Sequence, residues 1–195
     1  FVPEHFAFQF FAVGADFLAH VGVHVGDVDI LVPVVVEVED LDPHRAPRGL
    51  WENLAALHDE LLPAHVLIEL IVALHGLGSN PRQILNYPGL VDLAEKHGYV
   101  VVAPMGYNSR GWYGIFGPRP RGAKPKNLGE LSEQDVMNVV GIIERTFRID
   151  PDRTYLMGHS MGGGGTLHLG IKHPHKWAAL GPIAPAIYRS PNGLK

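Results

Sequence analysis

The chain has 195 residues, of which 46% are hydrophobic and 18% are charged, and its formal net charge is −4. This composition excludes a largely disordered protein, and the length suits one sizeable core. The negative charge argues against nucleic acid as a partner, no apolar run is long enough for a membrane span, and the absence of cysteine excludes disulfides and thiolate metal sites.

The charge is unevenly distributed along the chain. Residues 1–70 contain two Arg, no Lys and twelve acidic residues, whereas residues 71–195 are net basic. We therefore predict an acidic, Lys-free N-terminal segment of uncertain origin at residues 1–66 and a separate core at residues 67–195. The first residues show neither an initiator Met nor a basic signal-peptide region, so the sequence looks processed or partial and its localisation stays open.

The N-terminal segment predicts strands followed by a short helix. Residues 1–40 are rich in Val and Phe with partial alternation, which favours strands. Residues 50–62, LWENLAALHDELL, place apolar residues at helical spacing. No residues in this segment point to a chemistry.

From residue 67 onward, buried strands and helices are predicted in alternation. That order implies a mostly parallel sheet covered by helices on both faces, and therefore the α/β class. The expected elements are a strand at 67–76, a helix at 90–98 closed by Gly98, a strand at 99–105, a Gly/Pro-rich loop at 108–127, a helix at 131–147, a strand at 153–158, a helix at 163–173 and a strand at 177–186.

The helix at 131–147 has the clearest pattern. Val136, Val140 and Ile143 recur at helical spacing, and Ser132, followed three residues later by Asp135, is predicted as its N-cap.

Ser160 is the candidate nucleophile. The stretch GHSMG, residues 158–162, fits the G-x-S-x-G pattern in which a strand turns sharply into a helix and lifts the serine above the sheet. Glycines at both flanks are needed because the turn is too tight for side chains. A second glycine-containing stretch, LHGLG at residues 74–78, ends an earlier strand where a further donor for an oxyanion is needed.

Residues 67–195 resemble the α/β-hydrolase fold, and within it the esterases related to polyhydroxybutyrate depolymerases and feruloyl esterases, with prolyl-oligopeptidase-type peptidases close by. The matching stretches include IVALHGLGSNP, GYVVVAPMGYN, RGWYG and RTYLMGHSMGGG. The resemblance implies Ser160 as nucleophile and the backbone N–H groups of Leu77 and Met161 as the oxyanion hole. It implies a loop-orienting role for His75.

The aromatic segment around Trp112 and Tyr113 is a candidate lining for the substrate pocket, although ordinary loop packing explains it equally well.

The acid and the base of a catalytic triad are not found by the same reasoning. After Ser160 there is no Asp or Glu, and His168 lies eight residues into the following helix, roughly 12 Å along its axis. His173 and His175 lie further still. Asp150 and Asp152 lie at the start of the strand whose end carries Ser160, about 17 Å away from the turn. We therefore expect a partial α/β-hydrolase fold, truncated after the nucleophile helix and the following strand.

The leading hypothesis is a serine hydrolase that acts on carboxylic esters, in small molecules or polymers, through an acyl-enzyme. No metal or organic cofactor is required, and the oligomeric state is open. The alternatives are a prolyl-oligopeptidase-type serine peptidase and a non-catalytic domain on a hydrolase scaffold. Because the acid and base are missing, the 195-residue chain is expected to be inactive or nearly so.

Overall fold

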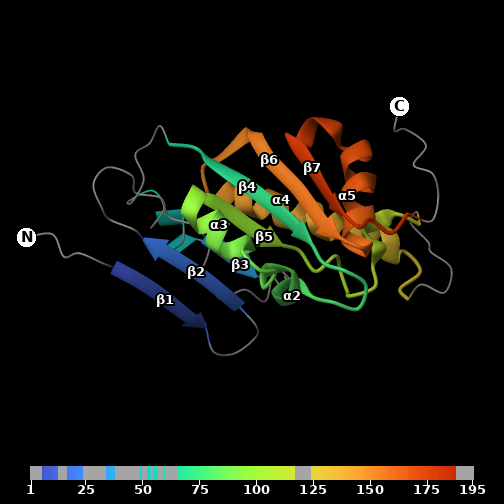
Figure 1. The fold of residues 1–195 in the computed structure, drawn as a ribbon, viewed down its shortest axis with the longest axis horizontal. Coiled ribbons are helices and arrows are strands. Elements are labelled where there is room, and N and C mark those ends of the chain that lie inside the picture. Colours follow the sequence, from blue (N-terminus) through green and yellow to red (C-terminus); the bar gives the residue numbers. More distant parts are fainter. Residues whose placement is uncertain are drawn as a thin grey trace, which may run out of the picture.

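The computed structural model describes residues 6–12, 17–23, 34–37, 49, 52–53, 55–56, 59, 66–116 and 124–187. These residues form a seven-stranded sheet in the order β1-β2-β3-β5-β4-β6-β7 (Figure 1). The strands are β1 (Phe6–Ala12), β2 (Phe17–Val23), β3 (Val34–Glu37), β4 (Ile68–Leu74), β5 (Tyr99–Ala103), β6 (Ile149–His159) and β7 (Ala179–Ile183). The helices are α2 (Pro81–Leu85), α3 (Leu90–His97), α4 (Leu128–Thr146) and α5 (Met161–Lys172), with 3-10 turns η1 (Trp112–Gly114) and η2 (Pro174–Lys176).

The sheet is mostly parallel, as the alternation of strands and helices predicted. β3, β5, β4, β6 and β7 pair in parallel with their neighbours, and only β1 and β2 add antiparallel pairs. The strands expected within residues 1–40 are therefore present, and β3 joins the sheet by pairing Val35 with Val101 of β5. The short helix expected at residues 50–62 lies largely outside the described residues. The division of the chain near residue 67 stays a prediction.

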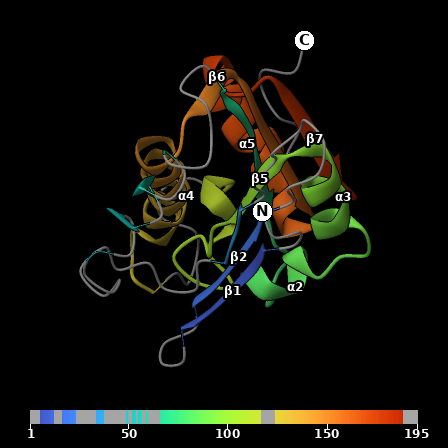
Figure 2. The same cartoon turned by 90° about the vertical axis from the view of Figure 1, so that its left-hand side faces the viewer.

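Helices cover both faces of the sheet, with α4 and α5 on one side and α2 and α3 on the other (Figure 2). Successive side chains of a strand point to opposite faces, so a strand buried on both sides needs an uninterrupted apolar run. In β4, Leu70 and Val72 join the core under α4, whereas Ala73 joins the core under α2 and α3. β5 divides in the same way, with Val102 on the first side and Val101 on the second.

α4 begins earlier than predicted, and the expected N-cap at Ser132 is wrong. The helix starts at Leu128, so Ser132 lies inside it and is fully buried. Its hydroxyl oxygen accepts a hydrogen bond from the Tyr113 N–H at 3.0 Å, and the Asp135 carboxylate accepts one from the Gly106 N–H at 2.8 Å. Both polar side chains therefore hold the loop after β5 instead of capping their own helix.

Of the two short helices, the end of α3 was predicted from the sequence, whereas α2 was not. α3 ends at Gly98, whose φ of 73° is the left-handed conformation expected of a helix-closing glycine. α2 was not predicted, although Asn80 caps it by accepting from the Gln83 N–H at 2.9 Å and Pro81 opens its first turn. An Asn-Pro pair is a recognisable helix start.

None of the helices within the described ranges is long and apolar enough to cross a membrane.

Glu133 connects α4 to α5. Its carboxylate lies 2.6 Å from Lys172 Nζ, 3.1 Å from His168 Nε2 and 3.3 Å from His173 Nε2. Burial opposes the charged form of this carboxyl, but the hydrogen bonds from Lys172, His168 and His173 outweigh burial and lower its pKa. The Glu133 carboxylate thus links α4 to α5 through ion pairs and hydrogen bonds on this face of the sheet.

We expect Glu133→Gln to destabilise the fold at neutral pH by about 1 to 2 kcal/mol, because a charged hydrogen-bonded tie is lost. A carboxyl whose pKa is lowered by folding stabilises the protein above its ordinary pKa of 4.5, and this contribution disappears as the pH falls through the folded-state pKa. Urea unfolding of both proteins between pH 7 and pH 3 should therefore show a difference that shrinks in acid. Glu130→Gln, an exposed change on the same helix, is the matched control; equal stability of Glu133→Gln and the parent at pH 7 would contradict the expectation.

Candidate active site

Ser160 lies between the end of β6 at His159 and the start of α5 at Met161. The strand and the helix predicted on either side of it are therefore present. Its backbone has φ 56° and ψ −110°, a conformation that residues with side chains rarely adopt. Such a conformation costs on the order of 1 to 3 kcal/mol and persists only where the surroundings enforce it.

Three backbone hydrogen bonds enforce the conformation of Ser160. Its N–H donates to the Ile183 carbonyl at 2.9 Å, and its carbonyl accepts from the N–H groups of Gly164 at 3.0 Å and Ala186 at 2.8 Å. The segment that follows β7 is therefore attached directly to the serine backbone. The strained turn is held from both sides, by its own helix and by the neighbouring strand.

The two glycines of the GHSMG pattern are required by close packing. A Cβ at Gly158 would lie 2.5 Å from the carbonyl carbon of Gly162, and a Cβ at Gly162 would overlap the Leu74 carbonyl and lie 2.8 Å from the His75 carbonyl oxygen. Contacts this short do not occur for real Cβ atoms. The strand-to-helix turn can therefore form only with hydrogen at both positions.

The next three glycines have a similar explanation. A Cβ at Gly163 would lie 2.8 Å from the Ile183 carbonyl oxygen, one at Gly164 would lie 2.6 Å from that of Ala186, and one at Gly165 would lie 2.6 Å from the Tyr113 ring. Each glycine costs about 1 kcal/mol of helix propensity relative to alanine. The run is retained in α5 because two loops pack directly against the helix backbone beside Ser160.

The loop after β4 lies next to Ser160. A Cβ at Gly76 would lie 3.8 Å from Ser160 Cβ, so this loop approaches the serine through Gly76. Buried His75 contacts the carbonyl oxygens of Gly76, through Nδ1 at 2.8 Å, and of Met105, through Nε2 at 2.9 Å. These contacts support the loop-orienting role expected of His75.

Of the two predicted backbone donors, Met161 is the first residue of α5, where an N–H has no partner inside the helix. Leu77 lies in the turn closed by the hydrogen bond from the Ser79 N–H to the Gly76 carbonyl at 3.1 Å. Both residues belong to segments that border Ser160. Their role as donors to an oxyanion stays a prediction.

The aromatic segment after β5 has an unusual backbone. Trp112 and Tyr113 both have positive φ values, 60° and 49°. Tyr113 is fully buried, its hydroxyl donates to the His75 carbonyl at 3.4 Å, and burial raises its pKa well above the ordinary value, so the hydroxyl remains a neutral donor. Tyr113 therefore supports the loop from inside. Of the two, only Trp112 is partly exposed, and its ring meets that of Phe116 edge to face with centroids 4.9 Å apart.

The histidines on either side of Ser160 in the chain have other partners. His159 Nδ1 is 2.8 Å from the Tyr87 hydroxyl, and the rings of His168 and His173 contact Glu133. The Ser160 hydroxyl makes no hydrogen bond within the described part of the chain.

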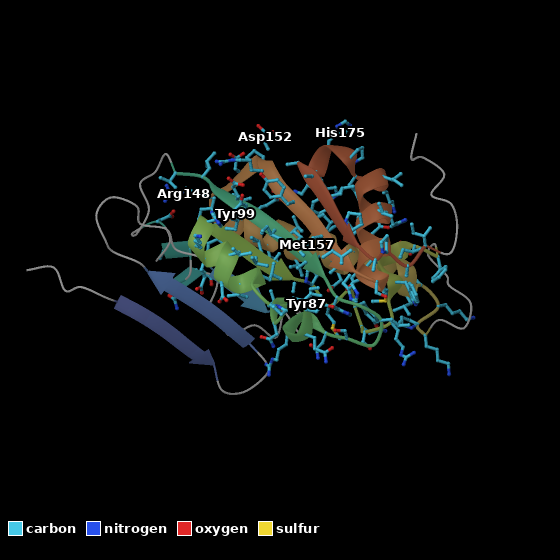
Figure 3. The ribbon with its side chains drawn as sticks, viewed as in Figure 1. Tyr87, Tyr99, Arg148, Asp152, Met157 and His175 are labelled. Carbon is cyan, nitrogen blue, oxygen red and sulfur yellow. The ribbon has the colours of Figure 1, made fainter. Side chains whose placement is uncertain are left out.

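Asp150 and Asp152, the acidic residues at the start of β6, lie at the opposite end of this strand from Ser160. Asp150 binds Arg153 at 2.7 Å at the start of β6, and Figure 3 shows Asp152 and Tyr99 toward one end of the strands and Tyr87 toward the other. Among the residues that the structure describes, no group of three or more His, Asp or Glu side chains is arranged to hold a metal ion.

A family model described as putative esterase matches residues 58–192. The S-formylglutathione hydrolase of Mus musculus is 28% identical over 128 residues, which span 57% of this chain and 44% of that protein. The structure of an S-formylglutathione hydrolase from Agrobacterium tumefaciens superimposes with a TM-score of 0.54 at 19% identity, covering 91% of this chain and 60% of the other. FphF, a fluorophosphonate-binding serine hydrolase of Staphylococcus aureus, gives a TM-score of 0.52 at 18% identity, covering 87% and 56%.

These likenesses confirm the expected α/β-hydrolase fold. The chain spans about half the length of the curated relatives that it matches.

Proposed function

The chain belongs to the esterase family whose model it matches, and on this basis we propose that it forms the nucleophile-bearing part of a carboxylic ester hydrolase that acts through Ser160. The observation that carries the proposal is the strained backbone of Ser160, held between a strand and a helix by hydrogen bonds to Ile183 and Ala186. A structure maintains such strain at functional positions.

In the proposed reaction the Ser160 hydroxyl oxygen attacks the ester carbonyl carbon while its proton passes to a base. The tetrahedral oxyanion is proposed to accept hydrogen bonds from the N–H groups of Met161, the first residue of α5, and Leu77, which follows Gly76. Collapse of this intermediate breaks the bond to the alcohol and leaves an acyl-enzyme on Ser160. Water then attacks the acyl-enzyme and releases the acid.

We further propose that the triad acid and base come from residues other than those described here. The support is that His75, His159, His168 and His173 each have a different hydrogen-bond partner, so none of them contacts the Ser160 hydroxyl. A general base must lie within about 3 Å of the proton that it abstracts. The complete enzyme would therefore take its acid and base from outside the described residues.

The substrate is proposed as an ester of a small molecule or a polymer, and the relatives extend the candidates to thioesters such as S-formylglutathione. A test compares hydrolysis of p-nitrophenyl butyrate and of a peptide p-nitroanilide by a longer form of the protein that contains the proposed acid and histidine. We expect the ester to be cleaved at least about 100-fold faster in kcat/KM. Faster cleavage of the anilide would contradict the esterase proposal and favour a prolyl-oligopeptidase-type peptidase. Cleavage of neither substrate would favour a non-catalytic domain.

A further inference from the structure

The two ring nitrogens of His75 both face carbonyl oxygens. The side chain is fully buried, with Nδ1 2.8 Å from the Gly76 carbonyl oxygen and Nε2 2.9 Å from the Met105 carbonyl oxygen. A carbonyl oxygen can only accept a hydrogen bond, and a neutral imidazole has one N–H and one lone pair. Both contacts are therefore hydrogen bonds only when both ring nitrogens carry a proton, which gives the ring a positive charge.

Asp135 places a negative charge beyond one of these two contacts. The Met105 carbonyl, which accepts from His75, belongs to the same peptide unit as the Gly106 N–H. Asp135 Oδ2 accepts from that N–H at 2.8 Å, so a single peptide unit lies between the carboxylate and the imidazole ring. A buried charge persists where an opposite charge and hydrogen bonds compensate it. Asp135 thus explains how a fully buried imidazole can hold two protons.

The other contact of His75 leads toward Ser160. The Gly76 carbonyl, which accepts from His75 Nδ1, belongs to the same peptide unit as the Leu77 N–H, the proposed donor to the oxyanion. Gly76 is also the point where this loop approaches the nucleophile, because a Cβ there would lie 3.8 Å from Ser160 Cβ. A hydrogen bond to a peptide carbonyl polarises the peptide unit and strengthens its N–H as a donor, and a charged donor has the larger effect.

Two other titratable side chains face this region from other elements. Tyr113 of η1 meets the His75 ring edge to face, with centroids 5.8 Å apart, and burial raises the pKa of Tyr113 so that its hydroxyl stays neutral. His159 of β6 has its Nδ1 3.7 Å from the position of a Cβ at Gly76, and the same nitrogen is 2.8 Å from the Tyr87 hydroxyl. Asp135 is therefore the group of opposite charge that hydrogen bonds connect to His75.

We propose that His75 is doubly protonated in the folded protein, that Asp135 keeps it so, and that the charged ring strengthens the Leu77 N–H as a donor to the oxyanion. The last step rests on the proposed function, because it assumes that Ser160 is the reacting group. Asp135 and His75 are positioning residues, since each acts through a backbone peptide unit. A chain of hydrogen bonds then runs from the Asp135 carboxylate through two peptide units to the oxygen that becomes negative in the reaction.

The protonation of His75 is measured by NMR of the nitrogen-labelled 195-residue chain at pH 7, which requires no turnover. We expect one histidine ring with two N–H protons that exchange slowly with solvent, because the His75 side chain is fully buried. Nuclear Overhauser contacts between this ring and the Tyr113 ring assign the signals to His75. A His75 ring with one unprotonated nitrogen would overturn the proposal.

Asp135→Asn separates the charge of Asp135 from its packing. The amide oxygen of asparagine can still accept from the Gly106 N–H, so the loop after β5 keeps this hydrogen bond while the negative charge is lost. We expect His75 to lose one ring proton at pH 7 and to show a single ring N–H. Glu130→Gln removes an exposed charge from the same helix and should leave both ring protons in place. Two ring protons retained in Asp135→Asn would refute the role of Asp135.

Ester hydrolysis by the longer form tests the link to the oxyanion. Asp135→Asn should lower kcat for p-nitrophenyl butyrate about tenfold and leave KM within about twofold, because the oxyanion forms only as the reaction proceeds. An unchanged kcat would reject this link. The NMR measurement on the parent chain remains decisive even where Asp135→Asn does not fold. A doubly protonated His75 in a protein whose longer form cleaves no ester would support the assigned protonation and reject the esterase function alone.

Discussion

Replacing Gly162 by alanine is expected to destabilise the protein by about 2 to 4 kcal/mol, although alanine is the better helix former. The added methyl group would overlap the Leu74 carbonyl and lie 2.8 Å from the His75 carbonyl oxygen. Leu74 ends β4, which is hydrogen-bonded to strands on both sides, so its backbone has no room to move aside. Urea denaturation followed by circular dichroism measures the change in the free energy of unfolding.

Gly141→Ala provides the matched comparison, since Gly141 also lies inside a helix, α4. A Cβ at this position would meet only the end of the Arg145 side chain at 3.2 Å, which can rotate away. This change should stabilise the protein by up to about 1 kcal/mol through helix propensity. If Gly162→Ala were as stable as Gly141→Ala, the close approach of the β4 end to α5 would be wrong.

The 195-residue chain on its own is expected to hydrolyse p-nitrophenyl butyrate at least about 10³-fold more slowly than a longer form that contains the proposed acid and histidine. The physical reason is that the structure shows no base bonded to Ser160 among the residues it describes, where His159 contacts Tyr87 and His168 contacts Glu133. The backbone donors alone stabilise the oxyanion but do not remove the serine proton. Initial rates at matched protein concentrations provide the measurement.

Ser160→Ala in the longer form is the control and should reduce its rate to nearly that of the short chain. Rapid turnover by the short chain that Ser160→Ala abolishes would contradict the expectation. In that case a base would have to be sought among the histidines of the chain itself, beginning with His159, the residue next to the nucleophile.

Much of the fold could be predicted because its signals are local. The buried runs at β4 and β5, the helical spacing of Val136, Val140 and Ile143 and the closing Gly98 each depend on a few neighbouring residues. The same holds for the strand and helix on either side of Ser160. The end of α4 nearest Ser132 was misplaced because polar side chains that resemble a cap instead bind a distant loop.

By itself the sequence determined the class of the fold and the position of Ser160 in a strand-to-helix turn, since periodicity and glycine spacing act over short stretches of chain. Only the tertiary structure showed which segments pack against the glycine run and against the aromatic loop. Gly164 and Gly165 face Ala186 and Tyr113, and the ring of Tyr113, for which pocket lining and ordinary loop packing were both open, is fully buried. These contacts join residues far apart in the chain, and whether a side chain is buried or exposed depends on the segments that pack against it, which no local pattern encodes.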